Sequence, residues 1–146
     1  MSHIVSENSF LPEVTCTVPG DLSVAYVERT GLFTVDDAGW VDYWMRVKFT
    51  PTFTTSAGGV LVKGLPDPDC SISAAIGGWM GAVMYASGFT WPYPSGFLTT
   101  NIEPYAPFGV RVFCAGSNSP LLVVQIGNLA SGQQVQFRVS GRFKAA

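Results

Sequence analysis

Two segments of the chain alternate between apolar and polar residues with the two-residue period of a half-buried β-strand. Residues 40–50 place their apolar side chains at alternate positions, namely Val41, Tyr43, Met45, Val47 and Phe49. Residues 134–143 repeat the pattern with Val135, Phe137, Val139 and Phe143, and Gly141 shares their face. Burying each large apolar side chain stabilises the fold by roughly 1.5–3 kcal/mol. A one-residue slip would forfeit several such contributions, so the register of both strands is firmly set.

Trp44 is the single apolar residue on the polar side of the first segment. A large ring on an otherwise polar sheet face marks a surface that something covers. We therefore expect Trp44 to lie under a loop or against another subunit.

Shorter strand patterns recur along the rest of the chain, with Gly or Pro turns between them. They fall at residues 13–18, 22–27, 31–35, 60–62, 71–76, 79–86, 96–102, 110–114 and 121–126. Residues 121–124 are continuously apolar, which predicts a strand covered on both faces, with another subunit as the candidate for the second cover. No segment has a convincing helical period, so the pattern predicts an all-β, antiparallel sandwich or barrel.

The domain organisation follows from length and polarity. Residues 1–12 are polar and predict an extended N-terminal arm, docked on a neighbouring molecule. Residues 13–146 predict a single β-sandwich domain, because a chain of this length buries roughly two thirds of its unfolded surface in one core.

Composition predicts an oligomer. The chain is 47% hydrophobic and only 12% charged, about half the charged fraction usual for a soluble domain. A permanent assembly hides apolar surface that a monomer must keep polar. The net charge is −2 and the eight Lys and Arg residues are scattered, which argues against a nucleic-acid partner. No signal peptide or membrane-spanning run is apparent, so we expect synthesis in a cytoplasm and no membrane partner.

Nucleophilic and metal chemistry have little support in the sequence. Cys16, Cys70 and Cys114 are widely spaced and odd in number, which favours buried free thiols over disulfides or a zinc site. The only histidine, His3, lies in the predicted arm, which is a poor platform for a catalytic triad. We expect neither an enzyme nor a bound cofactor.

The carboxylates also fit turns better than catalysis. A glycan hydrolase would need two carboxylates facing across a cleft. Asp36 and Asp37 fall in a predicted hairpin turn, and Asp67 and Asp69 in a Pro-rich loop, where turn chemistry explains them. A calcium site at Asp67 and Asp69 stays open, although two ligands are far fewer than calcium takes.

The stretch from residue 87 to residue 108 combines aromatic residues with four prolines and has little periodicity. Such a stretch either packs against a partner or presents a binding platform. Exposed rings at Trp91, Tyr93 and Tyr105 would stack on sugar faces, whereas buried rings would serve packing alone.

A set of short motifs resembles a β-sandwich module of tailed bacteriophages, found at the ends of tail fibres and in small virion decoration proteins. The motifs are Phe10-Leu11-Pro12-Glu13-Val14, Val24-Ala25-Tyr26, Arg29-Thr30-Gly31-Leu32-Phe33-Thr34, Trp40-Val41, Phe49-Thr50, Gly58-Gly59-Val60, Gly64-Leu65-Pro66, Ser131-Gly132-Gln133 and Val139-Ser140-Gly141-Arg142-Phe143. The chain departs from the family at residues 35–39 and at Asp67, where the family has a different turn and an aromatic residue.

The resemblance implies a jelly-roll-like, homotrimeric structural protein of the virion. It favours a capsid decoration or cement protein that binds the major capsid protein on the outer surface of the head. The alternative is a short tail-fibre or tail-tip protein that binds a host surface glycan. No catalytic residue comes with the resemblance. The partner-binding residues that we predict in the arm, the main strand and the aromatic loops are Phe10, Leu11, Trp44, Trp91, Tyr93 and Tyr105.

Overall fold

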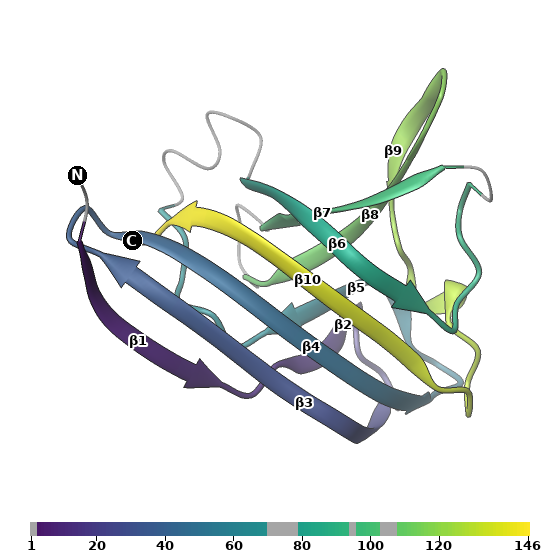
Figure 1. The fold of residues 1–146 in the computed structure, drawn as a ribbon. Helices are drawn as coiled ribbons and strands as arrows, with labels where there is room; N and C mark the ends of the chain where they lie inside the picture. The colour runs from purple at the N-terminus through teal and green to yellow at the C-terminus, as the bar shows by residue number, and fades with distance from the viewer. Residues whose placement is uncertain (1–2, 70–78, 94–95, 103–107) are drawn as a thin grey trace.

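The computed structural model describes residues 3–69, 79–93, 96–102 and 108–146. These residues form ten β-strands and one short 3-10 helix, η1 (Figure 1). The strands are β1 (Ile4–Phe10), β2 (Glu13–Val18), β3 (Ser23–Asp36), β4 (Trp40–Thr52), β5 (Ala57–Lys63), β6 (Trp79–Ser87), β7 (Phe97–Ile102), β8 (Val110–Gly116), β9 (Ser119–Val123) and β10 (Val135–Lys144). Helix η1 spans Ile126–Asn128. Residues 71–76 and Cys70, for which we made predictions, lie outside the described residues.

The strands pair antiparallel in one curled sheet of order β1-β3-β4-β10-β6-β7-β8-β5-β2, and β9 pairs β8. Strands β1, β3, β4, β10 and β6 form the half that faces the viewer in Figure 1, with β2, β5, β7 and β8 behind. The predicted all-β, antiparallel fold is confirmed. A sandwich of two separate sheets is not, because strand pairing continues without a break from β1 to β2.

The core lies between the two halves of the curled sheet. The alternating apolar residues of β4 and β10 are buried there, as their period predicts, with exposures of 3% or less. Val14 and Cys16 of β2, Val60 and Val62 of β5, and Val110 and Val112 of β8 face them from the other half. The register pairs Val47 with Phe137 and Met45 with Val139, so both strands turn their polar residues outward together.

Strand β3 is longer than the pattern predicts. Residues 22–27 and 31–35 were expected as two strands, but Ser23–Asp36 is continuous and pairs with β4 along its length. A register shift between Tyr26 and Glu28 accommodates Val27, which is 58% exposed. The polar residues that suggested a break therefore mark a β-bulge, which disturbs the alternation without ending the strand.

The N-terminal segment is extended, but it docks on its own chain. Ile4–Phe10 forms strand β1, which pairs with β3 at one edge of the sheet. The chain then turns through Leu11 and Pro12 into β2 at the opposite edge. Two hydrogen bonds hold this corner against β3: Val14 N donates to Tyr26 Oη (2.8 Å), and Arg29 Nε donates to Pro12 O (2.7 Å).

A carboxylate joins two neighbouring loops at one end of the sheet. The Asp21 carboxylate accepts hydrogen bonds from the backbone N–H groups of Thr54 (2.9 Å) and Thr55 (2.8 Å). The Thr54 hydroxyl, these N–H groups and the Thr55 hydroxyl together hold the pKa of Asp21 well below its usual range. Asp21 therefore ties the turn before β3 to the loop after β4.

Candidate interaction face

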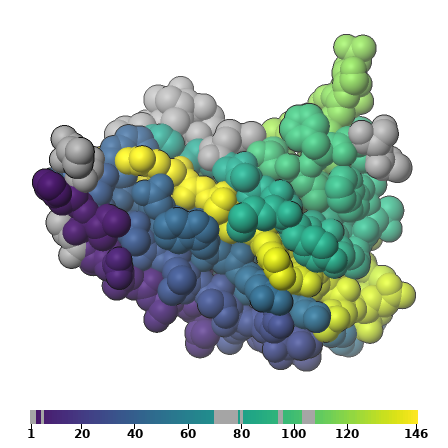
Figure 2. Space-filling view, in the orientation of Figure 1, coloured from purple at the N-terminus to yellow at the C-terminus, as the bar shows by residue number. Residues whose placement is uncertain are grey.

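The outward-facing side of β1, β3, β4, β10 and β6 is the surface with the clearest capacity to bind a partner. Strand register aligns its central residues in one row: Ser9, Leu32, Trp44, Ser140 and Ala82. Leu32 is 51% exposed and Trp44 46%. We call this surface, which faces the viewer in Figure 2, the Trp44 face.

The centre of the Trp44 face is apolar and shallowly hollowed. Met84 of β6 lies beside Trp44 and is 58% exposed, while Ile4 of β1 is 60% exposed on the other side of Leu32. Three adjoining hollows include Trp44 in their lining: one reaches Met84, one reaches Ile4, and one lies over Gly81 and its neighbours. The small residues of the third hollow leave the indole standing above the sheet.

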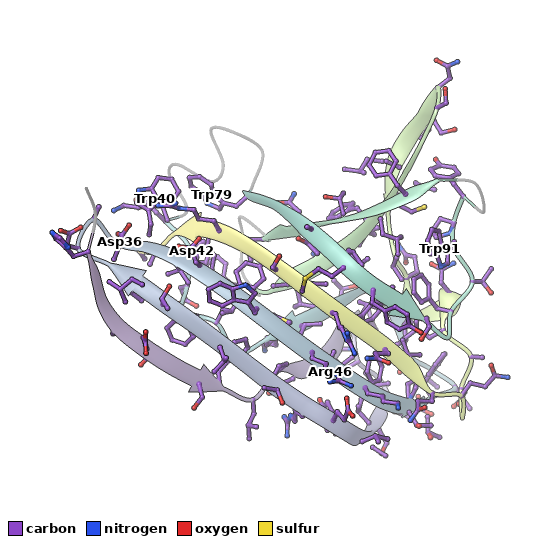
Figure 3. The ribbon with its side chains drawn as sticks, viewed as in Figure 1. Asp36, Trp40, Asp42, Arg46, Trp79 and Trp91 are labelled. Carbon is purple, nitrogen blue, oxygen red and sulfur yellow. The ribbon has the colours of Figure 1, made fainter. Side chains whose placement is uncertain are left out.

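Charged side chains surround this apolar centre. Arg46 Nε lies 2.7 Å from a carboxylate oxygen of Glu28. Arg142 lies 3.5 Å from the Asp36 carboxylate and 3.9 Å from that of Asp42, and its guanidinium stacks 5.0 Å from the Trp40 ring. Figure 3 shows Asp36, Trp40 and Asp42 grouped at one end of the face and Arg46 towards the other.

Arg138 differs from the other arginines of the face. Its guanidinium lies 5.7 Å from the Tyr85 ring, and no ion pair with it is formed among the described residues. An exposed tryptophan with apolar neighbours and an arginine-rich rim matches the composition of protein interfaces, where Trp and Arg supply much of the binding free energy. The arrangement is suited to binding a macromolecular surface.

A second apolar surface lies on the hairpin of β8 and β9, which projects from the body of the molecule in Figure 1. Leu121 is 45% exposed and Leu122 40%, whereas Val124 is fully buried. Within one chain Leu121 and Leu122 are therefore not covered on both faces, and the expectation that another subunit supplies the second cover stays a prediction. Among the described residues, β9 pairs with β8 alone.

Two of the predicted partner-binding residues lie at the corner between β1 and β2. The Phe10 ring packs against Phe33, with ring centroids 5.9 Å apart. It also lies where a Cβ on Gly31 would stand, so Phe10 serves packing within the chain. Leu11 is 63% exposed and stays a predicted contact.

The aromatic loop residues are engaged within the chain. Trp91 stacks on Phe89 (6.1 Å between centroids, 13° between planes), and Phe89 in turn packs on Phe137 in the core. The Tyr93 hydroxyl donates a hydrogen bond to Pro120 O (2.7 Å). Both rings are half-buried rather than fully exposed. Tyr105 lies outside the described residues.

The described residues hold no group of three or more His, Cys, Asp or Glu side chains that would bind a metal. Asp67 and Asp69 use their backbone groups to anchor the C-terminus: Ala146 N donates to Asp67 O (3.0 Å), and Asp69 N donates to Lys144 O (2.8 Å). Cys16 and Cys114 are buried free thiols, as predicted. Burial raises the pKa of the Cys16 thiol.

In the part of the chain that the structure describes, no helix is long and apolar enough to cross a membrane. No protein-family model matches the chain, and neither does any curated protein or solved structure.

The sequence identified one residue of the Trp44 face and missed its neighbours. Leu32 faces outward between Gly31 and Phe33, so a strict alternation along β3 would have predicted its outward position. Met84 lies at a register shift between β6 and β10, where alternation fails. Grouping them with Trp44 requires the pairing of β3, β4, β10 and β6, which residue pattern alone does not provide.

Proposed function

We propose that this chain is a structural protein of a bacteriophage virion, a homotrimeric decoration protein that binds the major capsid protein on the outer surface of the head. The observation that carries the homotrimer in this proposal is the Trp44 face, an exposed apolar centre with an arginine-rich rim that suits contact between copies. The resemblance of the sequence motifs to virion modules supplies the setting, and the low charged fraction of 12% supports assembly.

A decoration protein stabilises a shell by linkage. A ligand that binds only the mature form of the shell shifts the equilibrium towards that form. One site occupied at a free concentration of about 100 times Kd contributes about 2.7 kcal/mol, and the contributions of many sites on one head add. The protein would act by binding, without a chemical step.

Electron microscopy of the purified particle, labelled with a gold-tagged antibody to this chain, tests the proposal. Label over the head is the expected result, and heads that lack the chain should then rupture at lower temperature or milder osmotic shock. Label confined to the tail would overturn the decoration role and favour the alternative, a tail-fibre or tail-tip protein that binds a host glycan.

A further inference from the structure

The Trp44 face has an acidic half and a basic half, and the boundary between the two halves runs parallel to the strands. The half formed by β1 and β3 carries the acidic residues Glu7, Glu28 and Asp36. The half formed by β10 and β6 carries the basic residues Arg138, Arg142 and Lys144. Strand β4, which lies between the halves, contributes Asp42, Arg46 and Lys48, and Trp44 lies on this dividing strand.

Four of these charges have no opposite charge within ion-pair distance among the described residues. They are Glu7 on the acidic half, Arg138 and Lys144 on the basic half, and Lys48 on the dividing strand. The acids Glu28 and Asp36 are each joined to an arginine of the same chain. The acidic half therefore keeps one uncompensated negative charge, and the basic half keeps two uncompensated positive charges.

We propose that the Trp44 face is the surface through which copies of this chain meet, around an axis parallel to the strands that passes over Trp44. A rotation about this axis does not change the height of a residue along the strands. It brings the acidic half of one copy against the basic half of the next. Glu7 and Arg142 lie in one row through Thr34 and Asp42, so they meet at the same level. The count of three copies rests on the proposed function.

Five strands spaced about 4.8 Å apart, over about ten residues that rise about 3.3 Å each, give the Trp44 face an extent of about 24 Å by 33 Å, or about 800 Å². Each contact joins one half of this face to the other half of a neighbour's face and so covers about 400 Å² per copy. That is less than the roughly 800 Å² per partner of a standard interface, but each copy in the ring makes two such contacts. Trp44, Leu32 and Met84 occupy the middle of the face, where the residues that dominate binding energies are found.

The opposed charges also make the contact specific. Like halves brought together would repel, so the copies are held in the arrangement that places unlike halves in contact. This arrangement repeats the same contact around the axis and closes a ring, which prevents open chains of subunits.

The first experiment measures the mass of the purified full chain by light scattering during gel filtration, over a dilution series. We expect a mass three times the 15.6 kDa of one chain. Trp44→Glu should elute as a folded monomer, because half-exposed Trp44 contributes little to the core. Leu121→Glu, at a position of matched exposure (45% against 46%), should remain a trimer.

The outcomes separate the inference from the proposed function. A wild-type trimer that persists in Trp44→Glu overturns the assignment of the face and leaves the homotrimer intact. A wild-type dimer that Trp44→Glu dissociates overturns the three-fold count and the proposed homotrimer together, and a wild-type monomer overturns both proposals. Far-UV circular dichroism of each variant checks that the fold is retained.

A charge exchange provides a test that does not depend on Trp44. Lys144 lies two residues along β10 from Arg142, which is level with Glu7, and neither Glu7 nor Lys144 has an ion pair among the described residues. Glu7→Lys and Lys144→Glu each remove an attraction and add a repulsion between copies, so each should raise the dissociation constant by about tenfold or more. The double variant restores opposite charges to the two halves and should recover much of the affinity. Equal weakening by both single changes with no recovery in the double variant would overturn the inference.

Discussion

Replacing Gly141 with alanine tests the packing that supports the Trp44 face from beneath. Gly141 lies on β10 directly opposite Tyr43 on β4. An added Cβ would stand 2.5 Å from Tyr43 Oη and 2.7 Å from Tyr43 Cζ, closer than such atoms ever approach. The ring has no room to withdraw, since Tyr43 is 1% exposed and packs against Phe143 at 6.0 Å between centroids.

The expected magnitude follows from the cost of overpacking a core. Forcing one additional carbon into a well-packed site typically costs about 1–3 kcal/mol. For a domain of this size the change corresponds to a loss of about 2–12 °C in Tm. Equilibrium unfolding in urea, monitored by tryptophan fluorescence, gives the free energy directly. All proteins must be compared at one concentration, because assembly makes apparent stability concentration-dependent.

Two controls make this prediction sharp. Gly127→Ala adds the same carbon where nothing lies within 4 Å, and should change the stability little. In a Tyr43→Leu background the clash is gone, so Gly141→Ala should become neutral or stabilise by up to about 1 kcal/mol, because alanine loses less backbone entropy on folding. If Gly141→Ala proves as stable as the wild type in the presence of Tyr43, the packing argument is refuted.

Three further predictions follow from titratable groups. Because the pKa of Asp21 is lowered in the folded chain, its carboxylate stabilises the fold at neutral pH, and this stabilisation is lost as the pH falls below about 4. Asp21→Asn should therefore lower Tm at pH 7 and make Tm depend less on pH in the acid range. Burial raises the pKa of Tyr43 to about 12, an effect that Thr100 partly offsets, so stability should fall between about pH 10 and 12 as the unfolded phenol ionises first. In Tyr43→Phe, Tm should therefore fall less steeply between about pH 10 and 12 than in the wild type. An equally steep fall in Tm would contradict the raised pKa of Tyr43. Cys16 and Cys114 should react with a thiol reagent only after unfolding, as mass spectrometry of the labelled peptides would reveal.

The buried face of an individual strand could be predicted from the sequence, because it follows from the residues of that strand alone. Strands β4 and β10 alternate cleanly, so the buried positions of Phe49 and Phe137 follow from period alone. Irregular positions defeated the same reasoning: the bulge at Val27 looked like a break between two strands. Leu121 and Leu122 are half-exposed on a hairpin of the single chain, so the predicted cover for their strand would have to come from another molecule.

The candidate site was predictable only in part, for the same physical reason. Trp44 violates the alternation of its own strand, which one segment is enough to detect. Arg138 and Glu7 are ordinary polar residues on strands far apart in the sequence, and their significance lies in register and in the charges beside them. Residue pattern does not encode which strands become neighbours, because long-range pairing is decided by the packing of the whole sheet.

The most direct test of the account is oxidative footprinting of the chain in the purified particle, with dilute single chains as the reference. If the Trp44 face binds partner surfaces, Trp44 and Met84 should be strongly protected from hydroxyl radicals in the particle. In the dilute chain their exposures of 46% and 58% should leave both reactive. Equal reactivity of Trp44 and Met84 in the two preparations would contradict the account, because it would mean that nothing covers this face.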